Sequence, residues 1–431
     1  MRITMICIGS MGDVKPYIVL GRELQNRGHR VTICAFSNFQ SLAEENGMNF
    51  AAISGNVKAF MSDIMAPGAV GLSYVRQLRK TLRAIITPML QDMEKACEDS
   101  EVIMTTFFGQ MAQSLAEIKY VPFIQTHYFP MDRNPNTPIS SMPVIPLGRK
   151  WNMITYDLGY LLISSLEKFY LTKWRKEHGM SPRKLEGQPN YQLNGHTIPV
   201  LYAISPLLMQ RPVTWKENIH MTGFWIDKNE TTDYEPPTAL QDFINDGEPP
   251  IYIGFGSMTG NDIEGTLQLV LDSVAQSGVR AIIAKGWGGV SVPSSKNVFP
   301  ADFIPHNWLF SRVSAVVHHG GAGTTAAGLL AGKPTLIISF GGDQVFWGKR
   351  VHALGLGPRF IPREKLTTAR LTKGLIDLTQ TKSYRTATAE MSQRLIAEDG
   401  VANAATIIDD EIRKWMLLEG RPSGANEGND E

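Results

Sequence analysis

The same order of local elements occurs twice in this chain, once at the start of each half. In the first half, the nearly continuous apolar run RITMICI (2–8) is followed by a glycine turn, a stretch with apolar residues at helical spacing, and the apolar run RVTICAF (30–36). Buried strands joined through a helix are typical of a parallel sheet that is covered on both faces. The order restarts at PPIYIGFGS (249–257) in the second half. The pattern therefore predicts an α/β fold with two doubly wound, Rossmann-like halves.

Further apolar runs extend both predicted sheets, and a length of 431 residues fits two domains. The additional predicted strands lie at 101–107, 121–127, 280–286, 315–319 and 334–340, with a helix at 261–276. The join is expected at 227–250, a polar segment with four prolines. The expected divisions are an N-terminal domain (1–226), an interdomain linker (227–249), a C-terminal domain (250–404), a C-terminal helix (405–418) that would pack back on the N-terminal domain, and a disordered tail (419–431).

The composition argues against several classes of protein. Lys and Arg (42) nearly balance Asp and Glu (41), so no broad basic surface for nucleic acid is expected. Cys7, Cys34 and Cys97 are widely spaced, which predicts neither a disulfide framework nor a zinc knuckle and fits a reducing, cytoplasmic setting. The first residues predict a strand rather than a secretion signal, and no stretch of about 18 apolar residues predicts a membrane span. We expect a monomer or a weak dimer.

Ligands of open α/β sheets bind at the carboxyl ends of the strands, so the turns after the predicted strands are the places to search. IGSMGDVKPY (8–17) follows the first strand, with Gly9 and Gly12 allowing a sharp turn into a helix. Asp13 can cap that helix, or it can take a proton from a hydroxyl as a general base. The helix dipole would keep Asp13 ionised and therefore a weak base unless its pKa is raised. The two roles are compatible, and position alone favours neither.

The stretch VVHHGGAGTTAAGLLAGKP (316–334) allows three interpretations: a metal site, a phosphate site or a tight turn. Neighbouring residues on a strand point to opposite faces, so His318 and His319 cannot easily share one ion. No cysteine or carboxylate stands at ligand spacing, and we assign His318 to the core. Glycines that open a helix after a strand suit an anion, with His319 and Thr324 as further donors. The sequence therefore favours a phosphate site.

The segment FIPHNWLFSRVSAVVHHGGAGTTAAGLLAGKPTLIISFGGDQVFWGKRV (303–351) resembles the donor-binding signature of the UDP-sugar-dependent glycosyltransferases. It is most similar to the version in sterol 3-beta-glucosyltransferases and in vancomycin-type antibiotic glycosyltransferases. GSMGDVKPY, GFGSM (254–258) and IIAKGWGG (282–289) are also similar to motifs of those families, in the same order. The resemblance covers both halves. It implies the GT-B fold, in which the acceptor belongs to the N-terminal half and the nucleotide sugar to the C-terminal half.

The resemblance also implies roles for single residues. His319 falls on the histidine that contacts the pyrophosphate, and Asp343 and Gln344 fall on the pair that hydrogen-bonds sugar hydroxyls. Phe303 matches a position whose ring stacks on uracil, and His306 takes the place of a glutamine of the plant relatives. The remaining donor-site residues that the resemblance implies are Ser10, Gly12, Ser257, Trp287, Gly321, Ala322, Gly323 and Thr324.

The sequence departs at two positions from the motif of the plant members of this glycosyltransferase family, and both departures affect the expected mechanism. Ala327 replaces the glutamate that binds the ribose, which leaves the ribose contact unassigned. Asp13 replaces a catalytic histidine whose supporting aspartate has no clear match, so Asp13 is expected to act alone as general base. No two aspartates are separated by one residue, as a metal-dependent site would need, and the helix start is expected to take up the phosphate charge. We expect a metal-independent, inverting displacement that needs no cofactor besides the nucleotide sugar.

The acceptor is expected to be a hydrophobic small molecule bound by the region 128–215. The stretch 146–179 predicts an amphipathic helix that closes the core or forms an apolar wall, which leaves open a contact with a membrane surface. His127, Met61 and Trp151 are the acceptor candidates, although ordinary packing explains them nearly as well.

The sequence thus favours an O-glycosyltransferase that moves glucose from UDP-glucose to a sterol or another hydrophobic alcohol. An antibiotic, polyketide or phenolic acceptor is the alternative. A nucleotide-sugar epimerase and a catalytically inactive nucleotide-sugar-binding protein are further options. The presence of Asp13, His319, Asp343 and Gln344 favours an active transferase.

Overall fold

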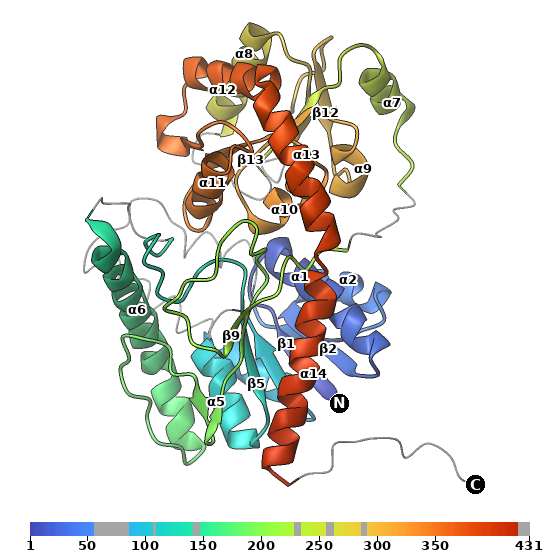
Figure 1. The fold of residues 1–431 in the computed structure, drawn as a ribbon. Coiled ribbons are helices and arrows are strands. Elements are labelled where there is room, and N and C mark those ends of the chain that lie inside the picture. Colours follow the sequence, from blue (N-terminus) through green and yellow to red (C-terminus); the bar gives the residue numbers. More distant parts are fainter. Residues whose placement is uncertain are drawn as a thin grey trace.

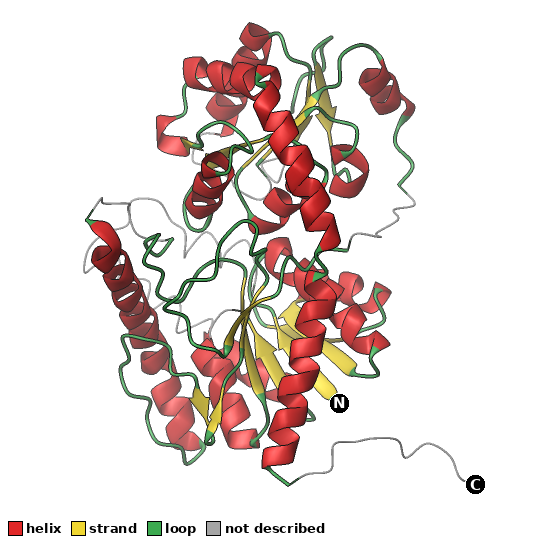
Figure 2. Cartoon of the chain, viewed as in Figure 1, coloured by secondary structure: helices red, strands yellow, loops and turns green. Residues whose placement is uncertain are grey.

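Two α/β domains, one above the other in the view of Figure 1, make up the computed structural model of this chain. Helices lie on both faces of each sheet (Figure 2). The structure describes residues 1–55, 86–106, 109–140, 147–227, 234–255, 263–285 and 291–420.

The N-terminal domain is built on a sheet of seven strands in the order β3-β2-β1-β4-β5-β8-β9. Every neighbouring pair in this sheet is parallel. The strands are β1 (Arg2–Ile6), β2 (Arg30–Phe36), β3 (Asn49–Ile53), β4 (Val102–Thr105), β5 (Phe123–His127), β8 (Val200–Tyr202) and β9 (Ile219–Met221). A short antiparallel pair, β6 (Gln192–Leu193) and β7 (His196–Thr197), stands apart from it.

The C-terminal domain contains a parallel sheet of six strands in the order β12-β11-β10-β13-β14-β15. The strands are β10 (Ile251–Gly254), β11 (Ala281–Ala284), β12 (Val298–Ala301), β13 (Ala315–His318), β14 (Thr335–Ser339) and β15 (Ile361–Pro362). Ile251 and Ile253 pack in one apolar cluster, while Tyr252 between them packs in another. Both faces of the sheet are therefore buried, as a near-continuous apolar strand requires.

The helices follow the strands in the alternating order that the sequence predicts. In the N-terminal domain they are α1 (Met11–Asn26), α2 (Gln40–Glu45), α5 (Gly109–Lys119) and α6 (Gly148–Glu177). In the C-terminal domain they are α7 (Thr238–Asn245), α8 (Ile263–Ser277), α9 (His306–Phe310), α10 (Ala322–Leu330), α11 (Gln344–Ala353), α12 (Thr368–Gln380) and α13 (Lys382–Ala397). The chain then returns to the N-terminal domain as α14 (Gly400–Leu418).

The strand orders place the candidate site at two equivalent points. β1 lies between β2 and β4, and β10 lies between β11 and β13, so each strand order reverses beside the first strand of its domain. Ligands of doubly wound sheets bind outside the strand ends at such a reversal. Asp13 follows β1, and His319 follows β13, directly beside β10. The predicted doubly wound fold is confirmed. The turn after β1 and the turn after β13 both lie at the carboxyl edges of their sheets, as expected.

The predicted strands agree with the observed ones to within a few residues, but several elements were not predicted. β3, β8, β9, β12 and β15 have no counterpart among the predicted strands. Three of them, β8, β9 and β15, are only two or three residues long, too short to give an apolar periodicity. The expected linker (227–249) contains the helix α7, and the expected tail begins with Glu419, which accepts a hydrogen bond from His196 Nε2 at 2.6 Å.

The C-terminal helix attaches the end of the chain to the N-terminal domain. α14 begins at Gly400, earlier than the predicted 405, after Asp399 caps its start through the Ala402 N–H at 3.1 Å. Its apolar side packs in the N-terminal core through Ala404, Ala405, Ile408 and Ile412. Figure 1 shows α14 running along the N-terminal domain while α13 stays with the C-terminal one.

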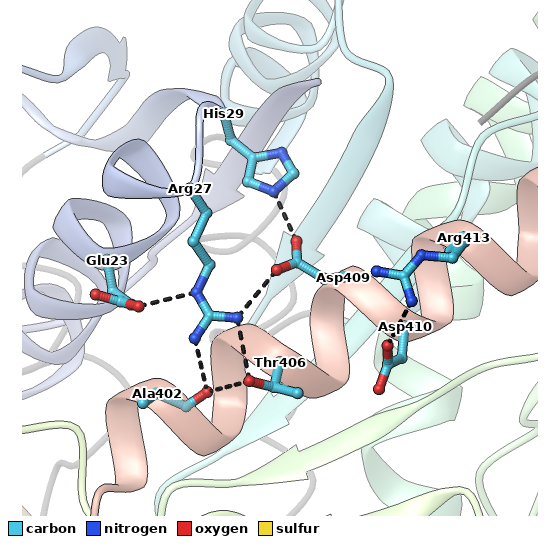
Figure 3. A network of polar contacts seen from close by, with 8 residues as sticks. All are labelled: Glu23, Arg27, His29, Ala402, Thr406, Asp409, Asp410 and Arg413. Atoms are coloured by element: carbon cyan, nitrogen blue, oxygen red, sulfur yellow. Dashed lines mark hydrogen bonds and ion pairs between the residues drawn. The ribbon is translucent and has the colours of Figure 1, made fainter. Parts of the chain in front are cut away.

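Arg27, at the end of α1, joins α14 through a polar network that Figure 3 shows. Its guanidinium donates to Glu23 on its own helix at 2.8 Å, and to Asp409 and Thr406 on α14 at 3.0 and 3.1 Å. The other oxygen of Asp409 contacts His29 Nε2 at 2.7 Å. Asp410, the next residue, contacts only Arg413 of the same helix within this network.

Replacing Asp409 should loosen the attachment of α14, and Asp410 offers a matched control on the same helix. We expect Asp409→Ala to lower the free energy of unfolding by about 1–2 kcal/mol, because a carboxylate with two partners from the N-terminal domain is lost from a partly exposed site. Asp410→Ala should cost less than about 0.5 kcal/mol, as exposed pairs within one helix do. Urea denaturation of both variants measures the difference, and equal losses would contradict this account.

Candidate active site

The turn after β1 holds Asp13 in a capping box at the start of α1. The backbone N–H of Ser10 donates to Asp13 Oδ2 at 2.7 Å, and the N–H of Gly12 donates to Ser10 Oγ at 3.3 Å. Such reciprocal hydrogen bonds satisfy the free N–H groups of a helix start. A Cβ at Gly9 would overlap the Asp13 carboxylate, so only glycine leaves the space that the carboxylate occupies. The cap therefore fixes where the carboxylate lies.

The surroundings of Asp13 also change its acidity. Removal from water raises the pKa of Asp13 to about 6, while the two hydrogen bonds from Ser10 act in the opposite direction. The hydroxyl of Tyr128 donates to the backbone carbonyl of Asp13 at 2.9 Å and ties the turn to the segment after β5. A carboxylate with a raised pKa is a better proton acceptor than an ordinary aspartate. Burial thus answers the objection that the helix dipole would leave Asp13 a weak base.

The glycine turn between β13 and α10 is tightly enclosed on one side. Gly320 has φ +96°, and a Cβ there would lie 2.7 Å from Ile337 Cγ2 and 3.2 Å from Gln344 Cα. Gly321 is the N-cap of α10, and a Cβ on it would lie 2.6 Å from Nε2 of His319. The helix start presents N–H groups that have no partner within the helix. Gly323, in contrast, has open space beside it.

The two histidines before this turn differ as the strand alternation predicts. His318 is fully buried, and its Nδ1 accepts the Gly320 N–H at 2.9 Å. The ring of His319 is inclined by 84° to that of His318, with the ring centroids 6.0 Å apart. Burial lowers the pKa of His319 to about 4, so its ring is neutral at physiological pH, and its buried Nδ1 has no hydrogen-bond partner among the described residues. No group of three or more His, Cys, Asp or Glu side chains suited to a metal occurs in the described part of the chain.

Phe303 precedes α9 (His306–Phe310), and His306 is the first residue of that helix. Phe303 is 85% exposed, which leaves its face available for stacking. His306 stacks on Phe310 with ring centroids 4.4 Å apart. Burial is the main cause that lowers the pKa of His306 to about 4, and the nearby Lys15 and His319 contribute to the same shift. Lys15 belongs to α1, so a cation from the N-terminal domain lies near the donor-side histidines.

The turn between β14 and α11 carries Asp343 and Gln344. Gln344 Oε1 accepts the backbone N–H of Phe340 at 2.6 Å, which closes the turn on itself. Asp343 Oδ2 accepts Nε1–H of Trp347, one helical turn later, at 3.2 Å. Trp347 is fully buried in an apolar cluster that contains residues of both domains. The carboxylate is therefore oriented by a side chain that is itself held between the domains.

The turns of the C-terminal domain lie close to the N-terminal domain where the two domains join. Ala322, at the start of α10, packs against the apolar core of the N-terminal domain. Burial and, to a smaller extent, the charge of Asp13 together raise the pKa of Asp343 to about 7. Two carboxyl groups from different domains, one at the start of α1 and the other at the start of α11, therefore lie within electrostatic reach of one another.

The acceptor candidates are less well placed than the donor candidates. Burial lowers the pKa of His127 to about 3, and its ring lies 5.1 Å from that of Tyr202, which suits a packed structural histidine. Trp151 lies in the first turn of α6 and keeps a buried Nε1 without a hydrogen-bond partner among the described residues. Met61, Ser257 and Trp287 lie outside the described residues.

Sequence reasoning missed three residues of this site. Trp347 stands four residues after Asp343 on the predicted helix, a spacing that could have indicated the contact. Lys15 lies within the motif GSMGDVKPY but is recognisable only once α1 is seen beside the other domain. Tyr128 contacts Asp13 across 115 positions of sequence, which no local pattern reveals.

Two family models match this chain, one in each half. Residues 3–131 match the glycosyltransferase family 28 N-terminal domain, and residues 268–409 match the C-terminal domain of the erythromycin biosynthesis protein CIII-like family. The first contains Asp13, and the second contains His319, Asp343 and Gln344. The residues that form the candidate site therefore lie inside the matched regions.

Among curated proteins, the chain is similar to sterol 3-beta-glucosyltransferases of fungi. It is 33% identical over 424 residues to that of Aspergillus fumigatus, a match that covers 95% of this chain and 30% of the relative. The enzyme of Debaryomyces hansenii is also 33% identical, over 95% of this chain and 27% of the relative. The chain thus spans less than a third of the length of these relatives.

The fold is also similar to that of several solved glycosyltransferase structures. The calicheamicin glycosyltransferase CalG4 matches with a TM-score of 0.68 at 17% identity, over 98% of this chain and 99% of the other. The Streptomyces sp. SF2575 glycosyltransferase SsfS6, solved with thymidine diphosphate, matches with a TM-score of 0.63 at 16% identity, over 95% and 99% of the chains. These similarities establish the GT-B arrangement of two Rossmann-like domains.

Proposed function

Because this chain belongs to the glycosyltransferases of the GT-B fold, we propose that it transfers a sugar from a nucleotide sugar to a hydroxyl of a hydrophobic acceptor. UDP-glucose is the proposed donor, and a sterol is the proposed acceptor. The fungal relatives are named as sterol 3-beta-glucosyltransferases, which supports this choice over an antibiotic or phenolic acceptor.

One observation carries the proposal. Asp13 from the N-terminal domain and Asp343 from the C-terminal domain lie close enough for the charge of Asp13 to raise the pKa of Asp343. A base for the acceptor and a hydrogen-bonding carboxylate for the sugar hydroxyls would then face the same space from opposite sides. Transfer between two bound molecules needs this arrangement, because the reacting atoms have to approach within about 3–3.5 Å.

In the proposed reaction, Asp13 accepts the proton of the acceptor hydroxyl while the oxygen attacks the anomeric carbon of the sugar. The bond between that carbon and the diphosphate oxygen breaks, and the configuration at the carbon inverts in a single displacement. Asp13 then holds the proton as a neutral carboxylic acid and returns it to water. The raised pKa of about 6 brings Asp13 closer to neutral pH, where proton transfer is most effective.

The leaving diphosphate carries growing negative charge, and the start of α10 is the proposed place for it. The N–H groups of Ala322, Gly323 and Thr324 lie in the first turn of this helix. Fixed donors of this kind stabilise an anion without reorganisation during the reaction. Neutral His319 would add a hydrogen bond, and Lys15 a positive charge from the other domain. We propose that these groups suffice without a metal ion.

Three further residues are proposed to contact the donor. The exposed ring of Phe303 is proposed to stack on the uracil, and Asp343 and Gln344 to bind the sugar hydroxyls. All three cysteines are free and buried, which supports a reducing compartment such as the cytoplasm.

The dependence of kcat/KM on pH should report the carboxyl pair. We expect kcat/KM to fall as the pH drops through about 7 to 6, because protonated Asp13 cannot accept the acceptor proton. His306 and His319 should not contribute, since their pKa values of about 4 keep them neutral throughout. In Asp343→Asn, kcat/KM should fall in a single step at low pH, near the pKa of Asp13. A flat profile from about pH 5 to 8 would contradict Asp13 as the base.

A direct assay tests the proposed function. The protein is incubated with UDP-glucose or TDP-glucose and a panel of sterols, phenols and polyketides, and the products are identified by mass spectrometry and by the anomeric coupling constant. A β-glucoside of a sterol formed from UDP-glucose is the expected result. Products only from the other acceptors would replace the sterol, and UDP binding without any product would favour a non-catalytic binding protein.

A further inference from the structure

The first half of helix α6 exposes an apolar stripe on its outer side. Ile154, Leu158, Leu161 and Leu162 follow one another at helical spacing, and Leu147 precedes them as the N-cap residue. These five side chains are between 38% and 62% exposed, and they make up five of the fourteen large apolar side chains exposed in the described part of the chain. Isolated exposed leucines are ordinary, but a row of them on one helix face marks an interaction surface.

Basic residues stand before and after this stripe along α6. α6 contains six basic and three acidic residues, a net charge of +3, against +1 for the whole chain. Arg149 and Lys150 are exposed before the stripe, and Lys173 and Lys176 are exposed after it. An apolar face with basic residues at both ends is typical of helices that lie in the surface of a bilayer containing anionic lipid.

Two of the three acidic residues of α6 are paired or buried, and the third, Glu177, offsets the charge of Lys173 alone. Asp157 is bound by both arms of the Arg133 guanidinium, at 2.6 and 2.5 Å. Glu167 is buried, and desolvation raises its pKa to about 8. Glu177 contacts Lys173 at 3.5 Å. The same positive charge on both partners would oppose packing of this face against a second copy of the chain.

The helix is positioned to present its apolar half to an outside partner. Its C-terminal half is held by buried Arg175, which binds Glu117 on α5 at 2.8 and 3.0 Å. Figure 1 shows α6 at the outer edge of the N-terminal domain, with its N-terminal end at the level where the two domains meet. The exposed stripe lies in that end of the helix. None of the helices in the described part of the chain is long and apolar enough to cross a membrane.

We propose that the outer face of α6 docks on the surface of a bilayer that contains anionic lipid. Ile154, Leu158, Leu161 and Leu162 enter the apolar boundary, and Lys150 and Lys176, on the same side of the helix, contact the headgroups. This placement would bring the site between the domains close to a membrane-dissolved acceptor. That purpose rests on the proposed function, whereas the docking itself rests on the helix face.

Vesicle flotation tests the docking with the full chain, using phosphatidylcholine vesicles with and without phosphatidylserine. Wild type should float with the anionic vesicles, and added salt should weaken the binding. Leu158→Asp/Leu162→Asp should lower the apparent affinity at least about tenfold, because two apolar anchors are lost and two negative charges are added. Lys150→Glu/Lys176→Glu should remove the preference for phosphatidylserine.

The chain supplies a matched control on another surface. Leu417 and Leu418 form an exposed leucine pair at the end of α14, and Leu417→Asp/Leu418→Asp adds the same charges there. This variant should bind vesicles like wild type. The proposal would be overturned if both leucine variants lost vesicle affinity equally, or if wild type did not float with the vesicles. A dimer in light scattering that only Leu158→Asp/Leu162→Asp dissociates would assign the face to a second copy instead.

A transfer assay with a detergent-dispersed acceptor separates the docking from the proposed function. Leu158→Asp/Leu162→Asp should keep its activity on the dispersed acceptor and lose activity on acceptor in vesicles. If wild type glycosylates no acceptor in either form while flotation follows the expected pattern, the proposed function fails and the docking stands. Unchanged thermal unfolding of the variant excludes a folding defect, since the replaced side chains are exposed.

Discussion

Asp13→Asn should lower kcat about 10²- to 10⁴-fold while UDP binds with unchanged affinity. The amide still offers an oxygen to the Ser10 N–H, so the capping box and the start of α1 survive. What is lost is the only group at this position that can take a proton from the acceptor. Single-turnover kinetics measure the chemical step, and isothermal titration measures UDP binding.

A capping carboxylate elsewhere provides the control. Asp399 caps a different helix, α14, through the Ala402 N–H at 3.1 Å and is not among the candidate site residues. Asp399→Asn should therefore retain wild-type kcat and lose at most a modest part of the free energy of unfolding. Turnover near the wild-type value in Asp13→Asn would remove Asp13 from the mechanism and leave it with the role of a helix cap.

Gly320→Ala should destabilise the protein by about 2–4 kcal/mol and strongly weaken UDP binding. The residue has φ +96°, which an L-residue with a side chain adopts only with strain. The new Cβ would also lie 2.7 Å from Ile337 Cγ2 and 3.2 Å from Gln344 Cα. Relief of that overlap has to move β14, the turn of Asp343 and Gln344, or the glycine turn itself. Urea denaturation and titration with UDP measure the two effects.

Gly323→Ala is the matched control for this substitution. Gly323 lies in the same motif, within α10, and a Cβ there meets nothing within 4 Å. Its replacement by alanine should leave the fold as stable as wild type or raise its stability by up to about 1 kcal/mol, because alanine favours a helix. If both variants lost equal stability, the enclosed position of Gly320 would not be the cause.

Local sequence patterns were sufficient to predict the architecture and to select the turns of the candidate site. The runs at 2–8 and 315–319 are apolar on both faces, and this indicates parallel strands that are buried on both sides. Ser10 and Asp13 stand at capping-box spacing, and strand alternation separates His318 from His319. Each of these inferences depends on residues that are neighbours in sequence. The short strands β8 and β9 escaped prediction because their pairing is set by distant partners.

The chemistry of the site depends on contacts that only the folded chain provides. The sequence by itself determined which residues stand at the helix starts: Asp13 at one, and His319 with its glycines at the other. Only the tertiary structure decided their acidity, because burial raises the pKa of Asp13 and brings Asp343 from the other domain within reach of its charge. Helix caps and strand faces follow from residues a few positions apart, whereas desolvation and charge coupling depend on every group that packing brings near, however distant in sequence.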